Sequence, residues 1–259
     1  MTDDHKEYED KFVRGLEFMW GEGYMSPGGR EEVSHIISDT PVHGCRVLDI
    51  GCGLGGIDLA LVEDHGANEV VGIDVEPELV ERGQQLITRK GMSGRIELQL
   101  VEPGNLPFPD SCFDGVFSKD SLLHITDKGH IFKEIFRVLR PGGWLAVSDW
   151  LGNGKPPSQV MLDWLDVFGL SFELDTLEHA GELVRSCGFT EVETEDRNAW
   201  YAGEMRNEIA SISGDNFPRL VAAVGEATAN QRVASSTAKL KVVDGGELRP
   251  GHIRGRKPV

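Results

Sequence analysis

The sequence predicts an α/β fold built on a doubly wound parallel sheet. Between residues 44 and 151, apolar runs of strand length alternate with helix-like segments, which makes four βα units in about 110 residues. The first apolar run ends in a cluster of glycines, and the second ends on an acidic residue, Asp74. These two features indicate a ligand-binding loop at the start of the core.

Each core element follows from a local pattern. The first strand is expected at 45–51, CRVLDIG, because a short apolar run that ends in glycine is typical of a buried parallel strand. The other core strands are expected at 68–75, 95–103, 112–121 and 144–151. The core helices are expected at 55–65, 78–90 and 130–139. The residues Arg140–Gly143 are expected to break the chain before the last core strand, because Pro and Gly interrupt regular elements.

The two ends of the chain differ from this regular core. Residues 1–43 contain helix-forming segments around Gly28 and Gly29 and are expected to form a lid over the sheet. After the core we expect helices at 160–168, 176–187 and 203–240, a strand at 189–194, and a basic, closing edge strand in the tail 248–259. We interpret residues 1–259 as one domain with a helical lid (1–43), a cofactor-binding core (44–151) and a substrate cap with closing strands (152–259).

Charge and residue content exclude several classes of function. Lys and Arg total 26 against 43 Asp and Glu, so the net charge is −17, which disfavours binding to nucleic acids. No apolar run approaches the length of about 18 residues that a membrane-spanning helix needs. The amino terminus, MTDDHKEYED, is too acidic and polar for a signal or transit peptide. The four cysteines form no CxxC pair, so we expect neither a disulfide framework nor a metal site, and the expected location is the reducing cytoplasm.

The glycine cluster has the spacing of a nucleoside-binding loop. Gly51, Gly53 and Gly56 satisfy GxGxxG, and glycines at this place let the backbone approach a ligand at the amino end of a helix. Asp74 follows at the end of the next strand, where a carboxylate can accept hydrogen bonds from both ribose hydroxyls. NAD enzymes share this arrangement. Asp49, two residues before the first glycine, would repel a pyrophosphate and attract a cationic ligand.

Three downstream segments carry a family resemblance. They are 101–108 (VEPGNLPF), 112–125 (CFDGVFSKDSLLHI) and 137–145 (RVLRPGGWL). Together with the glycine loop they resemble the class I S-adenosylmethionine-dependent methyltransferases. The resemblance implies a Rossmann-like sheet of seven strands with the last strand antiparallel. It also implies S-adenosyl-L-methionine as cofactor and S-adenosyl-L-homocysteine as product.

The upstream sequence narrows the resemblance. The segments Tyr8–Gly29 and Phe117–Ile125 are similar to segments of the phosphoethanolamine N-methyltransferases, a group that shares much of its architecture with the methyltransferases that form glycine betaine. The resemblance implies that Tyr8 and His124 form the catalytic pair and that Asp120 lies beside the substrate nitrogen. It implies cofactor contacts from Ser26, Gly51, Asp74, Val75, Glu102, Pro103 and Lys119.

These roles agree with the chemistry of methyl transfer. An ammonium group must lose a proton before its nitrogen can attack a sulfonium methyl in line, and the nitrogen must be held close to the methyl carbon. Histidine can accept that proton near neutral pH, and a tyrosine hydroxyl can orient the imidazole. The carboxylate of Asp120 would attract the ammonium.

The chain departs from the family where the phosphate of the substrate is recognised. Leu170 and Phe172 stand where the phosphoethanolamine enzymes have a cationic and a phenolic side chain, and only Lys239 matches a third phosphate contact. A smaller amine such as glycine, sarcosine or dimethylglycine is therefore a candidate beside phosphoethanolamine. Trp150 and Trp200 are candidates for a cage around a methylated ammonium, or for core packing, and Arg254 is a candidate carboxylate clamp.

The favoured interpretation is a methyltransferase that acts on the nitrogen of a small amine. The alternatives are a carbon or oxygen acceptor on a natural-product or lipid-like substrate, a module that binds S-adenosylmethionine without chemistry, and a dehydrogenase. The sequence leaves open the acceptor, the number of methyl groups transferred and the oligomeric state.

Overall fold

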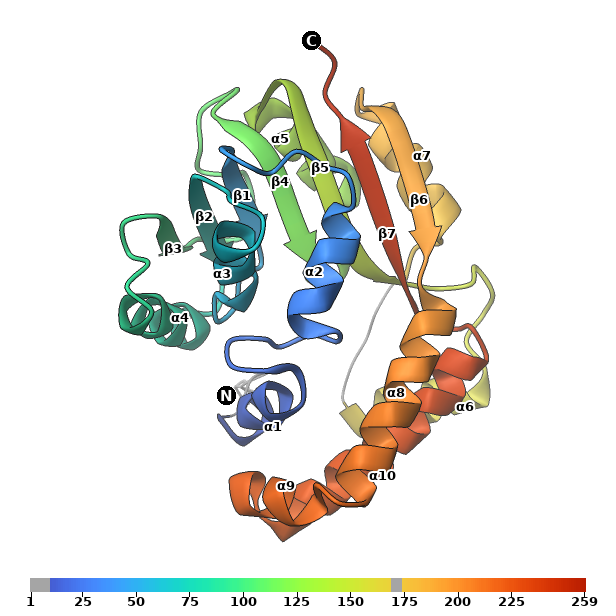
Figure 1. The fold of residues 1–259 in the computed structure, drawn as a ribbon. Coiled ribbons are helices and arrows are strands. Elements are labelled where there is room, and N and C mark those ends of the chain that lie inside the picture. Colours follow the sequence, from blue (N-terminus) through green and yellow to red (C-terminus); the bar gives the residue numbers. More distant parts are fainter. Residues whose placement is uncertain (1–9, 169–173) are drawn as a thin grey trace, which may run out of the picture.

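A seven-stranded sheet forms the centre of the protein. The computed structural model describes residues 10–168 and 174–259, and the strand order is β3-β2-β1-β4-β5-β7-β6 (Figure 1). The strands are β1 (Arg46–Ile50), β2 (Glu69–Asp74), β3 (Ile96–Leu100), β4 (Phe113–Lys119), β5 (Leu139–Leu151), β6 (Thr190–Asp196) and β7 (Arg249–Arg256). Strands β1 to β5 pair in parallel, whereas β7 is antiparallel to both of its neighbours. The expected doubly wound sheet with an antiparallel last strand is confirmed.

The strand order reverses between β1 and β4. In a doubly wound sheet the carboxyl ends of the two strands at such a reversal border a crevice in which ligands bind. The glycine loop follows β1, and Asp120 follows β4. The topology therefore brings the two sequence segments of greatest chemical interest to one edge of the sheet.

Helices cover both faces of the sheet. The elements that flank the sheet are α2 (Gly29–Ile37), α3 (Gly56–Glu63), α4 (Pro77–Arg89), the 3-10 helix η1 (Leu122–His124), α5 (Lys128–Val138) and α7 (Leu177–Ser186). Apolar residues of α2, α3 and α4 share one buried cluster with one face of the sheet, and those of α5 and α7 share another with the opposite face. This two-sided burial explains why the core strands are continuous apolar runs.

A group of helices lies beyond the carboxyl ends of the strands, at the bottom of Figure 1. It consists of α1 (Asp10–Trp20), α6 (Gln159–Phe168), α8 (Asn198–Ser213), α9 (Phe217–Val224) and α10 (Glu226–Asp244). Helix α10 packs on α8, α6 and α9, and α1 packs on α9. The amino-terminal segment and the cap thus meet over the edge that carries the glycine loop. No helix among residues 10–168 and 174–259 is long and apolar enough to cross a membrane.

Two expectations about the strands are wrong. The tail strand β7 is not an edge strand, because it pairs with β5 on one side and with β6 on the other, and the outer strand is the polar β6. The tail is basic for a different reason: its cations bind internal acceptors, as Lys257 does with the carbonyl oxygens of Phe136 and Leu139 at 2.7 Å. The segment Arg140–Gly143 does not end the strand either. It lies inside β5, where the pairing with β4 shifts its register.

Candidate active site

The glycine loop is held open by its own backbone and by Asp74. Gly51 and Gly53 have φ angles of 79° and 52°, a region that favours glycine. One carboxylate oxygen of Asp74 accepts the N–H of Gly53 at 2.8 Å, and the other accepts the N–H of Glu76 at 3.0 Å. These bonds fix the Asp74 carboxylate beside the loop at the end of β2.

The loop lies close to the segment after β4 and beside exposed apolar side chains. A Cβ atom at Gly51 would overlap the side chain of Ser121, so the loop and the segment after β4 meet closely only because residue 51 is glycine. Val75 and Leu100, at the ends of the paired strands β2 and β3, are 47% and 53% exposed and present an apolar surface. The predicted contacts Glu102 and Pro103 are exposed just beyond β3.

The segment between α1 and α2 closes over the loop. The carbonyl oxygen of Gly23 accepts the N–H of Gly56 at 3.1 Å, at the amino end of α3. The Met25 sulfur lies 3.3 Å from the position of a Cβ atom at Gly53. Ser26, the next residue, is half-buried. The other predicted lid residue, Tyr8, lies outside the described residues, as do Leu170 and Phe172.

Lys119 and Asp120 form a buried ion pair where β4 ends. The Lys119 ammonium lies 2.6 Å from one Asp120 oxygen, and their side chains are 4% and 8% exposed. The N–H of Asp120 donates to the carbonyl oxygen of Ser148 at 2.8 Å. The second oxygen, Oδ1 of Asp120, is buried and has no hydrogen-bond partner among the described residues. A predicted cofactor contact and a predicted substrate contact therefore touch each other and leave one acceptor open.

His124 is the last residue of η1, and its side chain is exposed at the same edge of the sheet. A second carboxyl group, which the sequence analysis missed, lies buried near this segment. Asp149 on β5 is 3% exposed, and its Oδ1 has no hydrogen-bond partner among the described residues. Burial, and then the charge of Asp120, raises the pKa of Asp149 to about 8.

Lys239 of α10 reaches into a box of aromatic rings. Its ammonium lies 4.0 Å from the ring centre of Trp150, 5.2 Å from that of Tyr201 and 5.9 Å from that of Trp164. Trp150 and Tyr201 pack edge to face at 4.8 Å. The described residues offer the Lys239 ammonium no hydrogen-bond acceptor and no ion pair. Burial lowers its pKa to about 8 although Asp120 and Glu208 favour the charge.

The ring of Trp200 also contacts a cationic side chain. The Arg197 guanidinium lies 4.7 Å from the centre of its ring, and the ring packs so closely on Gly28 that a Cβ there would lie 2.9 Å from it. Both predicted cage tryptophans thus hold a side-chain cation of the protein itself. The ring of Trp200 also joins the cap to the loop that precedes α2.

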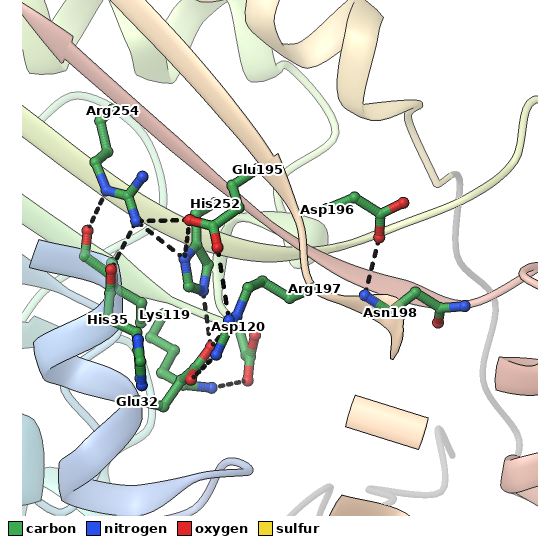
Figure 2. A network of polar contacts seen from close by, with 11 residues as sticks. Glu32, His35, Lys119, Asp120, Glu195, Asp196, Arg197, Asn198, His252 and Arg254 are labelled. Atoms are coloured by element: carbon green, nitrogen blue, oxygen red, sulfur yellow. Dashed lines mark hydrogen bonds and ion pairs between the residues drawn. The ribbon is translucent and has the colours of Figure 1, made fainter. Parts of the chain in front are cut away.

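A buried ionic network connects α2 with the last strands (Figure 2). Glu32 of α2 contacts Arg197 at 2.7 Å and His252 of β7 at 2.9 Å, and Glu32 and His252 are almost fully buried. Arg254, the candidate clamp, donates to the carbonyl oxygens of His35 and Ile36 and to Glu195. The burial of Glu32 could have been inferred from the sequence, because this residue lies at helical spacing with the apolar residues that form the buried face of α2. Its partners could not be read from that signal.

Asp49 is fully buried on β1, beneath the loop. Its carboxyl group faces Asp58 in the first turn of α3, another residue that the sequence analysis missed. The sequence contained a signal for Asp58, because it is an acidic residue inside the apolar run GIDLALV.

Comparisons with known proteins agree with this geometry. Residues 41–163 match the family model described as a methyltransferase domain. The chain is 30% identical over 256 residues to a phosphoethanolamine N-methyltransferase of Triticum aestivum, which covers 98% of the chain and 49% of the relative. It is 28% identical to the phosphoethanolamine N-methyltransferase of Plasmodium falciparum, with 76% and 74% covered. The chain spans about half the length of the plant relatives that it matches.

Solved structures share the fold. Phosphoethanolamine N-methyltransferase 2 of Haemonchus contortus, in complex with phosphomonomethylethanolamine and S-adenosylhomocysteine, aligns with a TM-score of 0.90 at 23% identity, covering 99% of this chain and 60% of that one. A protein of Galdieria sulphuraria described as a possible sarcosine dimethylglycine methyltransferase aligns with a TM-score of 0.75 at 22% identity, with 88% and 85% covered. The chain thus carries a match to a methyltransferase domain at residues 41–163, and over most of its length it is similar to phosphoethanolamine N-methyltransferases.

Proposed function

We propose that this protein transfers a methyl group from S-adenosylmethionine to the nitrogen of a small amine. The observation that carries the proposal is the open acceptor of Asp120, because a buried carboxylate oxygen without a donor is a place for an N–H group of a ligand. An ammonium would supply both the hydrogen bond and the opposite charge. A carbon acceptor would satisfy neither, and a phenol would supply the hydrogen bond without the charge.

The residues around the loop are assigned to the cofactor. Gly51, Gly53 and Ser26 would border its methionine part, and the Asp74 carboxylate would accept the ribose hydroxyls. Val75, with Glu102 and Pro103, would border the adenine. When bound, the cofactor supplies a sulfonium methyl group. Lys119 acts on this site through Asp120, whose charge it balances at 2.6 Å.

His124 is assigned as the base that takes the proton from the substrate ammonium, with Tyr8 as its partner. The support for His124 is its place in the chain, four residues after Asp120 and exposed at the edge where β4 ends. Asp120 would hold the ammonium while His124 receives its proton.

The acceptor is assigned as an amine that carries a negative group. Asp120 has an open acceptor, while the Lys239 ammonium has aromatic neighbours and no acceptor among the described residues. A ligand with one ammonium and one phosphate or carboxylate would satisfy both. The substrate named for the Haemonchus protein has this charge pattern. We further propose that lid, core and cap act as one domain, which the contacts of Glu32 with Arg197 and His252 support.

The test is methyl transfer from labelled S-adenosylmethionine to a panel of acceptors. The panel contains phosphoethanolamine, ethanolamine, glycine, sarcosine, dimethylglycine, an aromatic amine and a phenol. Label on an amine with a phosphate or carboxylate, and little on ethanolamine, is the expected result. Label on the phenol alone would contradict the nitrogen assignment, and label on ethanolamine alone would contradict the role of Lys239.

A further inference from the structure

Two carboxyl groups share one enclosed space beneath the glycine loop. Asp49 of β1 and Asp58 of α3 are both 0% exposed. No N–H or O–H group of another described residue donates a hydrogen bond to any of their four oxygens. Asp49 is paired in register with Gly72 of β2, and the space over Gly72 is taken by the Asp58 carboxyl group, so the two carboxyl groups face one another. A hydrogen bond between them requires that one of the two groups carries a proton, because a carboxylate is an acceptor only.

The surrounding chain leaves room for this pair. A Cβ atom at Gly72 of β2 would lie 2.6 Å from an Asp58 oxygen, so a glycine on the neighbouring strand makes the space. Asp58 lies in the first turn of α3, where the helix dipole favours a negative charge. The amino end of the helix therefore stabilises one negative charge on the pair, and the shared proton neutralises the other negative charge.

The other titratable groups around the pair add no positive charge. Asp74 at the end of β2 acts on both carboxyl groups, and burial together with Asp74 raises the pKa of Asp49 and that of Asp58. The buried thiol of Cys52 lies in the loop above, and its pKa is raised in turn by burial and by the three carboxylates. Tyr24, from the segment that covers α3, is buried. Burial raises the pKa of Tyr24, and the charge of Asp58 adds to this shift. The proton state of the pair thus depends on whether a cation lies over the loop.

We propose that Asp49 and Asp58 form a proton-sharing pair that distinguishes the cofactor from its product by charge. S-adenosylmethionine carries a sulfonium charge that S-adenosylhomocysteine lacks. The sulfonium favours the pair with two negative charges, so binding of the cofactor releases the shared proton to solvent. After methyl transfer the positive charge is gone, the pair binds a proton again, and the product is held less tightly. The inference rests on the proposed function through the cofactor alone.

Isothermal titration calorimetry of the wild-type protein is the first test. Each ligand is titrated between pH 6 and pH 8 in two buffers with different ionisation enthalpies, which gives the number of protons released on binding. S-adenosylmethionine is expected to release more protons than S-adenosylhomocysteine. The ratio of the two affinities should rise with pH, by up to about tenfold for each unit by which the cofactor lowers the pKa of the pair.

The variant Asp58→Asn identifies the source of these protons. The amide can donate to Asp49 and hold its carboxylate ionised without a proton to share, so the difference in proton release between the ligands should vanish. Asp64→Asn, at the exposed end of the same helix, removes the same charge and should keep the wild-type difference.

Each result of these titrations has one consequence. Equal proton release for the two ligands in the wild type would overturn the inference while leaving the proposed methyl transfer intact. A wild-type difference that persists in Asp58→Asn would also overturn it. Failure of both ligands to bind would overturn the cofactor assignment and the inference together. The wild-type comparison stands on its own if Asp58→Asn does not fold.

Discussion

The carboxylate of Glu32 accepts two hydrogen bonds from the guanidinium of Arg197, 165 residues further along the chain, at 3.1 and 2.7 Å. Glu32 belongs to α2, within the predicted lid (1–43), and Arg197 precedes the first long helix of the predicted cap. This buried ion pair therefore connects the amino-terminal segment, which covers the glycine loop, with the cap. Its loss should affect both stability and the placement of the lid.

The variant Glu32→Gln is expected to lower the free energy of unfolding by about 3 kcal/mol, because it leaves the Arg197 charge without its buried partner. Chemical denaturation at neutral pH measures this change. Arg206→Gln, which breaks an exposed ion pair with Asp244, should change the free energy of unfolding by less than about 1 kcal/mol. Equal effects of the two variants would contradict the special role of the buried pair.

Stability should fall as the pH drops below about 6.5, the ordinary pKa of histidine. Burial lowers the pKa of His252, although the hydrogen bond to Glu32 opposes this shift. The neutral ring donates to Glu32 and accepts from Arg254. A histidine whose folded pKa is lowered contributes stability above its unfolded pKa and loses it as the pH falls through its folded pKa.

Thermal unfolding between pH 8 and pH 5 measures that dependence. The variant His252→Gln, which keeps a neutral donor, should show a flatter decline of the midpoint temperature over this range. His35→Gln, at an exposed position of α2, should keep the wild-type slope. An unchanged slope in His252→Gln would assign the decline to other groups.

The variant Asp149→Asn is expected to raise the free energy of unfolding at pH 7 by up to about 4 kcal/mol. Because the folded pKa of about 8 lies above the unfolded value, this residue reduces stability as the pH rises toward 8. The neutral amide removes that dependence. Denaturation at several pH values checks the prediction, and Asp166→Asn, exposed on α6, serves as the neutral comparison.

The variant Lys239→Met should raise the KM for an amine with a phosphate or carboxylate by roughly tenfold to a hundredfold, the effect of losing a hydrogen bond between charged groups. Affinity for S-adenosylhomocysteine should not change. Lys241→Met is the matched control, because Lys241 lies on the same helix with its side chain exposed. A KM effect that is equal for ethanolamine would show that Lys239 does not recognise the negative group.

The variant His124→Ala should lower kcat by about 10²- to 10⁴-fold, the usual contribution of a general base. Because the side chain is exposed, the variant is expected to fold, and calorimetry with S-adenosylhomocysteine checks that the site persists. Higher pH should partly restore the rate as the free amine becomes more abundant. Unchanged turnover would remove His124 from the mechanism.

Short-range patterns were sufficient to predict most of the fold. The run 45–51 became β1, Thr176 caps α7 as its position before the apolar segment suggests, and GxGxxG gave the loop that Asp74 holds. These features depend on neighbouring residues and on backbone periodicity. The place of β7 inside the sheet could not be predicted in this way, because pairing partners far apart in sequence compete for the same strand.

The sequence by itself determined the order of strands and helices along the chain and the glycine loop, and it predicted the resemblance to methyltransferases, since backbone conformation and alternation of apolar residues are local properties. The tertiary structure decided what each charged side chain meets. Only packing brought Asp58 to Asp49, surrounded the Lys239 ammonium with aromatic rings and buried Glu32 against Arg197. The physical reason is that desolvation and pairing depend on elements distant in the chain, and these two effects shift the pKa of buried groups such as Asp58 and Lys239.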